Sequence, residues 1–313
     1  MLGSSAVAVR VVAPARLHLG FASTGLLMWP WSGIGLAVEE PQTVVEARPV
    51  GEPGIRVSGP RSDEALELAE LVARRVGLGA GVDLRVVDAP PRHVGLGAGT
   101  QLALSVLEAV SRIAGAEPRL DILVSAGVVG AFSWVGVAAF KSGGFIIDLG
   151  AGLSVRRQHI TLRFPQEWLV VHARPPGRQG HPRKGEAEKL RAMSYSRETE
   201  QRLVELLMKE IVPGVLDRDL ELFGRGLAEY QRTVGAAFAS HQQGTFNPDS
   251  KPIVSAMEEA GLLGVGQSSW GPTVYGFTES RRRAEETARS LSERLGLVAT
   301  VTEANNSGAR VST

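Results

Sequence analysis

The stretch PRHVGLGAGTQLALSVLEAV (Pro91–Val110) joins a glycine-rich turn to a long apolar run. Gly95, Gly97 and Gly99 fall within five residues, and no helix breaker follows them. The apolar run predicts a helix over Thr100–Ala114, so the glycines lie where that helix begins. A backbone without side chains at this point either lets the chain turn sharply or lets a ligand come very close to it.

The ligand that suits this position is a phosphate. A helix N-terminus presents unpaired N–H groups and a partial positive charge, and glycines remove the Cβ atoms that would keep an anion away. The spacing is neither Walker A nor G-x-G-x-x-G, since Thr100 stands where the third glycine of the latter should be. Thr100 and Gln101 can add side-chain donors at the helix start. From the residues alone, a phosphate site and a simple strand-to-helix turn both remain open.

Composition excludes several classes of protein. The chain has 313 residues, 43% of them hydrophobic, which is enough for one large or two medium domains. Its 34 basic and 33 acidic side chains form no block of like charge, so we expect neither a nucleic-acid nor a membrane partner. No stretch is apolar for long enough to span a membrane. Cysteine is absent, which excludes disulfides and suits the cytoplasm.

Strand and helix patterns alternate irregularly, which favours an α+β fold over a doubly wound sheet. Trp168–Ala173 has the pattern of a buried strand, and the sequence pattern changes just before it, near Pro165. We therefore predict two domains, residues 1–163 and 164–313. Val137–Phe140 and Gly144–Asp148 are expected to form a hairpin, with Lys141 in its turn.

Several motifs resemble a known family. The pattern P-x-x-x-G-L-G-x-G, met by Pro91–Gly99, resembles the phosphate loop of the GHMP kinase superfamily, and Pro14-Ala15-Arg16 resembles its N-terminal motif. The segment GVGQSSWGPTVYGF (Gly264–Phe277) is more specific, and resembles the β-ribofuranosylaminobenzene 5′-phosphate synthase family. ARLHLGF, GIGLAVEEP, VGVAAFKSGGFIIDLG and HQQGTFN are also similar to that family, in the same order, so the resemblance covers nearly the whole chain.

The resemblance implies a two-domain GHMP-kinase-like fold, with an N-terminal domain like ribosomal protein S5 and a ferredoxin-like C-terminal domain. It also implies a transferase that joins phosphoribosyl pyrophosphate to an aromatic acid, 4-aminobenzoate or 4-hydroxybenzoate, in tetrahydromethanopterin biosynthesis. Pyrophosphate and CO2 leave. Departure of pyrophosphate requires Mg²⁺ and fixed cationic or N–H donors. We expect a homodimer.

The candidate site residues follow from these motifs. Arg16 and His18 point the same way from one strand and are either a surface pair or an anion clamp, with His18 as a proton carrier. Substrate binding is assigned to the glycine loop, to Lys141 and to the C-terminal motif: Gly95, Leu96, Gly97, Ala98, Gly99, Thr100, Gln101, Lys141, Gln267, Ser268, Ser269, Trp270 and Gly271.

Four of these assignments have a structural alternative. Asp148 ends an apolar strand, and either holds Mg²⁺ through water or caps the following turn. Lys141 is a phosphate contact or simply a residue of the hairpin turn. Trp270 contacts the ligand or packs in the core. The basic stretch Arg174–Lys189 is a solvated loop or a lid over the pyrophosphate.

One segment departs from the family pattern. Relatives carry an arginine where this chain has Val128-Val129-Gly130-Ala131-Phe132, so a bidentate grip on phosphate or carboxylate is missing there. Two other functions therefore stay open. The first is an ATP-dependent small-molecule kinase that uses the same loop, and the second is a non-catalytic paralogue that binds a ligand or a partner.

Overall fold

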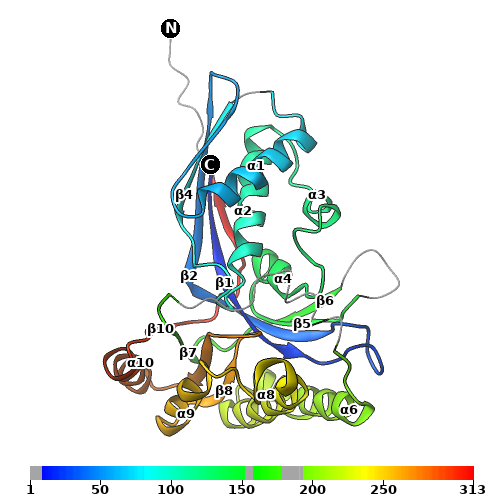
Figure 1. Ribbon diagram of the computed structural model, residues 1–313, viewed down its shortest axis with the longest axis vertical. Coiled ribbons are helices and arrows are strands. Elements are labelled where there is room, and N and C mark those ends of the chain that lie inside the picture. The colour runs from blue at the N-terminus through cyan, green and yellow to red at the C-terminus, as the bar shows by residue number, and fades with distance from the viewer. Residues whose placement is uncertain (1–8, 80, 152–157, 178–189, 191–192) are drawn as a thin grey trace.

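The computed structural model describes residues 9–79, 81–151, 158–177, 190 and 193–313. Most of the basic stretch expected as a loop or lid, residues 178–189, lies outside them. Figure 1 shows two layered units, one above the other, crossed by the long blue strands of the N-terminal region. The described part of the chain therefore has two sheets, each with its own helices.

The upper sheet has mixed topology. Its main path runs β11-β1-β2-β4-β3; β5 pairs with β2, and β6 with β5. Only β3 and β4 are parallel; the other pairs are antiparallel. The strands are β1 (Val9–Phe21), β2 (Gly33–Val50), β3 (Ile55–Ser58), β4 (Gly81–Asp88), β5 (Phe145–Asp148), β6 (His159–Leu162) and β11 (Arg310–Ser312).

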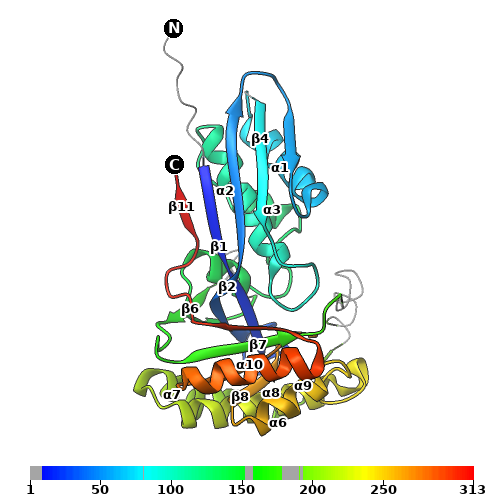
Figure 2. The same cartoon turned by 90° about the vertical axis from the view of Figure 1, so that its left-hand side faces the viewer.

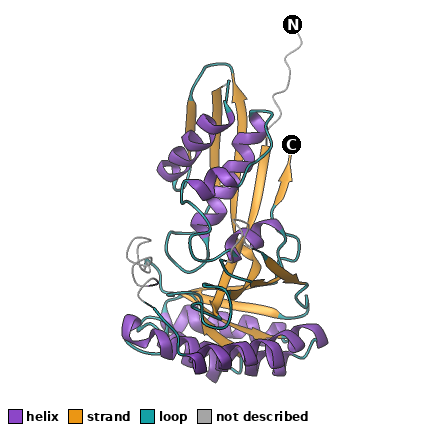
Figure 3. Cartoon of the chain, turned by 90° about the vertical axis from the view of Figure 1, so that its right-hand side faces the viewer, coloured by secondary structure: helices purple, strands orange, loops and turns teal. Residues whose placement is uncertain are grey.

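Helices cover one face of this sheet, as Figure 3 shows; the opposite face is turned to the viewer in Figure 2. They are α1 (Ser62–Val76), α2 (Ala98–Ile113), α3 (Asp121–Ser125) and α4 (Val135–Lys141). In α1 the apolar positions recur on one face, and Gly77 ends the helix at φ +70°, a conformation that glycine adopts without strain. The helix α2 is buried along most of its length, which explains its unbroken apolar sequence.

The lower sheet is antiparallel, with strand order β10-β7-β9-β8. Its strands are β7 (Leu169–Arg174), β8 (Leu263–Gln267), β9 (Val274–Thr278) and β10 (Val298–Thr302). Numbered within the unit, this is the order 4-1-3-2 of a ferredoxin-like split β-α-β. Together with the mixed upper sheet, it confirms the expected α+β class.

The helices of the lower unit lie beneath its sheet (Figure 1). They are α6 (Arg197–Leu206), α7 (Val212–Asp217), α8 (Leu220–Gln242), α9 (Lys251–Glu259) and α10 (Arg281–Leu295), with a π-helical turn at Leu207–Ile211 between α6 and α7. None of the helices in the described part of the chain is long and apolar enough to cross a membrane.

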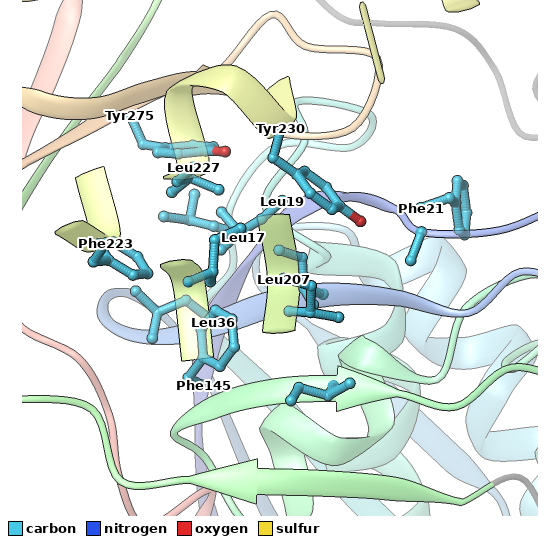
Figure 4. Packing of buried hydrophobic residues seen from close by; sticks show 14 of the residues in the cluster. Leu17, Leu19, Phe21, Leu36, Phe145, Leu207, Phe223, Leu227, Tyr230 and Tyr275 are labelled. Carbon is cyan, nitrogen blue, oxygen red and sulfur yellow. The ribbon is translucent and has the colours of Figure 1, made fainter. Parts of the chain in front are cut away.

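A single apolar core joins the two units. Leu17 and Leu36, from the lower parts of β1 and β2, pack with Phe145 against Phe223 and Tyr230 of α8 (Figure 4). These side chains are fully buried. Because aromatic and leucine side chains each contribute roughly 1.5–3 kcal/mol on burial, this contact strongly favours one fixed arrangement of the two sheets.

The expected hairpin is wrong in its first half. Val137–Phe140 belongs to α4, and only Gly144–Asp148 contains a strand, β5. A short run in which nearly every residue is apolar has neither helical nor strand periodicity, so its pattern could not distinguish the two. Lys141 is therefore the last residue of a helix.

The division into domains of residues 1–163 and 164–313 stays a prediction. The chain passes from the upper to the lower sheet between β6 and β7, close to Phe164. The chain then returns, because β11 at the C-terminus pairs with β1 of the upper sheet. The C-terminal residues thus belong to the upper sheet rather than to the lower one.

A buried carboxylate fixes the loop between β1 and β2. Glu200 of α6 is fully buried, and its oxygens accept hydrogen bonds from the Ser23 hydroxyl and from the N–H groups of Thr24, Gly25, Leu26 and Leu27. Burial alone would raise the pKa of Glu200, but these hydrogen bonds lower it below its usual value. The loop is thereby tied to the helices of the lower unit.

We expect Glu200→Ala to lower the free energy of unfolding by about 3 kcal/mol or more, because the Ser23 hydroxyl and four backbone N–H groups would lose their hydrogen bonds to a buried carboxylate. Chemical denaturation measures this loss, and Glu205→Ala, one turn further along α6, is the control. The folded pKa lies below the unfolded one, so this stabilisation is complete above pH of about 4.3 and declines as the pH falls below it. A variant as stable as the control would contradict the assignment.

Candidate functional site

The glycine loop leads directly into α2. Gly95 and Gly97 have φ values of +88° and +71°, which favour glycine, and Gly97 is the residue before the helix. No side chain caps the helix N-terminus. The first N–H groups of α2 therefore have no partner of the usual capping kind, which is the arrangement that binds anions at a helix start.

Two other segments hold the loop in place. Arg16 of β1 donates from its backbone N–H to the carbonyl oxygen of Leu96 (3.1 Å) and from Nη1 to that of Gly95 (2.9 Å). The Ser268 hydroxyl also donates to the Gly95 carbonyl (2.5 Å), and it accepts the N–H of His18 (3.0 Å). The N-terminal motif, the glycine loop and the C-terminal motif thus meet at one place.

A cleft of about 390 Å³ opens beside this meeting point. Its volume falls within the range of roughly 300–1,000 Å³ typical of small-molecule sites. Arg16, the beginning of α1, the glycine loop, residues 128–130 and residues 269–271 line it. It therefore lies between the upper helices and the C-terminal motif.

The structure brings most of the predicted binding residues to this cleft. Those that line it are Gly95, Gly97, Ala98, Gly99, Thr100, Ser269, Trp270 and Gly271. Leu96 and Gln101 are instead buried, and Gln101 donates to the carbonyl of Gly136 in α4. Gln267 lines a smaller neighbouring pocket, and its Nε2 donates a hydrogen bond to Oε1 of Gln242. Leu96, Gln101 and Gln267 therefore support the surrounding structure and do not line the cleft.

Asp148 and Lys141 lie away from the cleft. The Asp148 side chain is fully buried, and its oxygens accept the N–H groups of Trp134 at the start of α4 (2.5 Å) and of Gly150 (3.0 Å). This is the capping alternative rather than the metal-ligating one. Lys141 is exposed at the far end of α4 and lines neither pocket.

His18 is buried next to the cleft, with 3% of its surface exposed. Desolvation, with a smaller contribution from the Arg16 charge, lowers its pKa to about 3. Its Nδ1 accepts the N–H of Gly20 (3.3 Å), so the neutral ring carries its proton on Nε2. The ring is therefore uncharged at neutral pH, so Arg16 supplies the positive charge of this pair. The surface-pair alternative is wrong for His18, which is buried, and its role as a proton carrier stays a prediction.

Trp270 separates the cleft from the neighbouring pocket. Its side chain is 5% exposed and packs edge-on against Phe238 at 4.8 Å between ring centroids. It lines both the cleft and the smaller pocket, which has about 30 Å³, room for about one water molecule. Trp270 thus belongs to the core and also lines the cleft.

Sequence reasoning missed five polar or charged residues that line the cleft. Arg61, Glu64 and Glu67 come from the start of α1, and Arg92 and His93 precede the glycine loop. Arg92 and His93 could have been predicted, because they belong to the same stretch as the glycines. The three residues of α1 could not, because they reach the cleft only through the packing of α1 beside α2.

Comparison with known proteins agrees with this geometry. Residues 207–296 match the family described as GHMP kinases C terminal. The β-ribofuranosylphenol 5′-phosphate synthase of Methanothermobacter thermautotrophicus is 27% identical, over 86% of this chain and 88% of its own. The protein of the same name from Methanocaldococcus jannaschii is 25% identical, over 96% of this chain and 99% of its own.

Solved structures show the fold. Mevalonate kinase of L. major matches with a TM-score of 0.75 at 14% identity, covering 97% of this chain and 99% of its own. Homoserine kinase of Cytophaga hutchinsonii matches with a TM-score of 0.71 at 18% identity, covering 100% and 99%. The chain therefore has the fold of the GHMP kinase superfamily. Within it, the resemblance to the β-ribofuranosylaminobenzene 5′-phosphate synthase family is confirmed by relatives along nearly the whole chain.

We expect Gly97→Val to abolish binding of inorganic pyrophosphate while the protein remains folded. A Cβ at Gly97 would lie 2.6 Å from Cγ of Arg16, so the variant must displace that side chain, and φ +71° strains any L-residue. Calorimetry measures binding and circular dichroism the fold. Gly51→Val is the control, since no atom lies within 4 Å of its Cβ. Equal affinity in a folded Gly97→Val protein would contradict the site.

We expect the His18 ring to remain neutral across the physiological range. Its ¹⁵N chemical shifts should not change between pH 5 and 8, and they should report the Nε2-protonated tautomer. Since the folded pKa of about 3 lies below the unfolded value of about 6.5, stability falls as the pH drops through this interval. A titration midpoint near 6.5 for His18 in the folded protein would be inconsistent with its burial.

Proposed function

We propose that this protein is an enzyme of the β-ribofuranosylaminobenzene 5′-phosphate synthase type. It joins phosphoribosyl pyrophosphate to 4-aminobenzoate or 4-hydroxybenzoate and releases pyrophosphate and CO2, in tetrahydromethanopterin biosynthesis. The observation that carries the proposal is the meeting of three motifs at an uncapped helix start in a cleft of small-molecule size. The names of the whole-length relatives support it.

The chemistry balances without a net proton transfer. The bond between ribose C1 and the pyrophosphate oxygen breaks, and its electron pair leaves with pyrophosphate. A π pair of the aromatic ring forms the new bond to C1 at the carbon that bears the carboxylate. The electron pair of the carbon–carboxylate bond then restores the aromatic ring as CO2 departs.

The residues of the cleft suit these steps. Arg16 and the N–H groups at the start of α2 lie where charge on the departing pyrophosphate would be stabilised, and such preorganised donors usually supply the largest contribution to catalysis. Val128, Val129 and Trp270 line the cleft and offer apolar surface for the aromatic ring. The same surface would keep water from the reactive ribose carbon.

Magnesium fits this cleft as an ion brought with the substrate. Among the residues that the structure describes, no three His, Cys, Asp or Glu side chains gather into a metal site. Mg²⁺ is commonly held by one or two carboxylates together with substrate phosphates. Glu67 and the Thr100 hydroxyl line the cleft and would hold it, where the ion would neutralise charge on pyrophosphate.

A homodimer and a cytoplasmic location complete the proposal. The family resemblance supports both, and the absence of cysteine from all 313 residues suits a reducing compartment. Light scattering of the purified protein measures the oligomeric state directly.

We expect the purified protein, with Mg²⁺ and phosphoribosyl pyrophosphate, to release labelled CO2 from carboxyl-labelled 4-aminobenzoate or 4-hydroxybenzoate, with one pyrophosphate per CO2. Gly97→Val should release neither product. A parallel incubation with ATP and small alcohols such as homoserine should form no ADP. Formation of ADP would instead indicate a kinase, and a folded protein that is inactive in both assays would indicate a non-catalytic paralogue.

A further inference from the structure

Arg61 is a fixed side chain at the entrance of α1. Its Nε and Nη2 donate to Oε2 of Glu64 (3.0 and 2.6 Å), and its Nη1 donates to the carbonyl of Pro90 (3.2 Å). Only 10% of the Arg61 side chain is exposed. An arginine held by three hydrogen bonds keeps one orientation, unlike a mobile surface cation.

A second arginine joins the same carboxylate. Nε of Arg92 donates to Oε2 of Glu64 (2.7 Å), although 47% of this side chain is exposed. Glu64 therefore holds two guanidinium groups side by side, and the group of three side chains carries a net positive charge. All three line the cleft.

The arginine pair lies on the other side of the helix start from Arg16. A Cβ built on Gly99 would lie 3.9 Å from Nη2 of Arg61 and 4.0 Å from Oε1 of Glu64, whereas a Cβ on Gly97 would touch the side chain of Arg16. The cleft thus has cationic groups at two places, one beside Gly97 and one beyond Gly99. Two such places suit a ligand with two anionic groups.

We propose that Arg61 and Arg92 form a second anion subsite, which binds one phosphate end of the substrate while the other end lies at the helix start beside Arg16. The inference rests on the proposed function, because phosphoribosyl pyrophosphate carries a 5′-phosphate and a 1-pyrophosphate on opposite sides of one ribose. Arginine binds phosphate through two parallel N–H···O bonds, so the pair fixes the direction in which the substrate lies. It also supplies cationic charge that residues 128–132 lack.

The same pair disfavours a nucleoside triphosphate. A nucleotide at the helix start has all its phosphates in one chain, and its other end is an uncharged base. Such a base offers no anion to the net positive charge that Arg61, Arg92 and Glu64 carry together, whereas a second phosphate group does. The subsite therefore selects for two separated phosphate groups.

The test uses the double variant Arg61→Gln/Arg92→Gln and two probes, phosphoribosyl pyrophosphate and inorganic pyrophosphate, measured by calorimetry with Mg²⁺. We expect the double variant to lose about tenfold or more in affinity for phosphoribosyl pyrophosphate, the effect of one or two charge-assisted bonds. Its affinity for inorganic pyrophosphate should change less than about threefold, since that probe needs only the helix start. Arg112→Gln, which removes a half-exposed, Glu108-paired arginine at the far end of α2, is the control.

Three outcomes would overturn the subsite. The first is an unchanged affinity of the double variant for phosphoribosyl pyrophosphate. The second is an equal loss of affinity for both probes, which would indicate only a general effect of charge. The third is failure of the wild-type protein to bind phosphoribosyl pyrophosphate. Arg92→Gln alone, at an exposed position, repeats the test if the double variant has a lowered thermal midpoint. Failure of the proposed function gives a different result. A protein that binds this substrate through both subsites but releases no CO2 would contradict the proposed reaction and still support the subsite.

Discussion

The site depends on hydrogen bonds that fix the carbonyl groups of the glycine loop. Those of Val94, Gly95 and Leu96 accept hydrogen bonds from Thr273, from Arg16 and from Ser268, so three successive acceptors are satisfied from within the protein. A loop whose carbonyls are fixed in this way leaves the N–H groups at the start of α2 for a ligand. The glycines permit the turn, but residues far away in the sequence hold it.

This constraint couples the site to the whole fold. Ser268 is 173 residues from Gly95 and 250 from His18, so its hydrogen bonds exist only when the lower sheet is docked on the upper one. The docking depends in turn on the shared core around Leu17 and Phe223. We therefore expect the cleft and the contact between the units to form together, and substrate to stabilise that contact by mass action.

The sequence predicted features that depend on neighbouring residues or on recognisable motifs. The helix after the glycines, the α+β class and the convergence of Arg16 with the C-terminal motif all follow from residues that a reader can see in order. The helix at Val135–Lys141 was missed because its residues lack periodicity, and the neutral His18 because burial cannot be read from a pattern. Arg61 joins the cleft only through the packing of α1 on α2.

The same frame serves kinases and, on the present proposal, a carbon–carbon bond-forming enzyme, since function depends on the site rather than on the fold. Both chemistries need a helix start that receives phosphates. The rest of this cleft is lined by Arg61 and Arg92 and by the apolar residues Val128, Val129 and Trp270. With His18 neutral beside it, the positive charge at the cleft comes from the arginines and the helix start. On the present proposal, the phosphate groups of the substrate bind to these positive groups, and the apolar residues receive the ring of the aromatic acid.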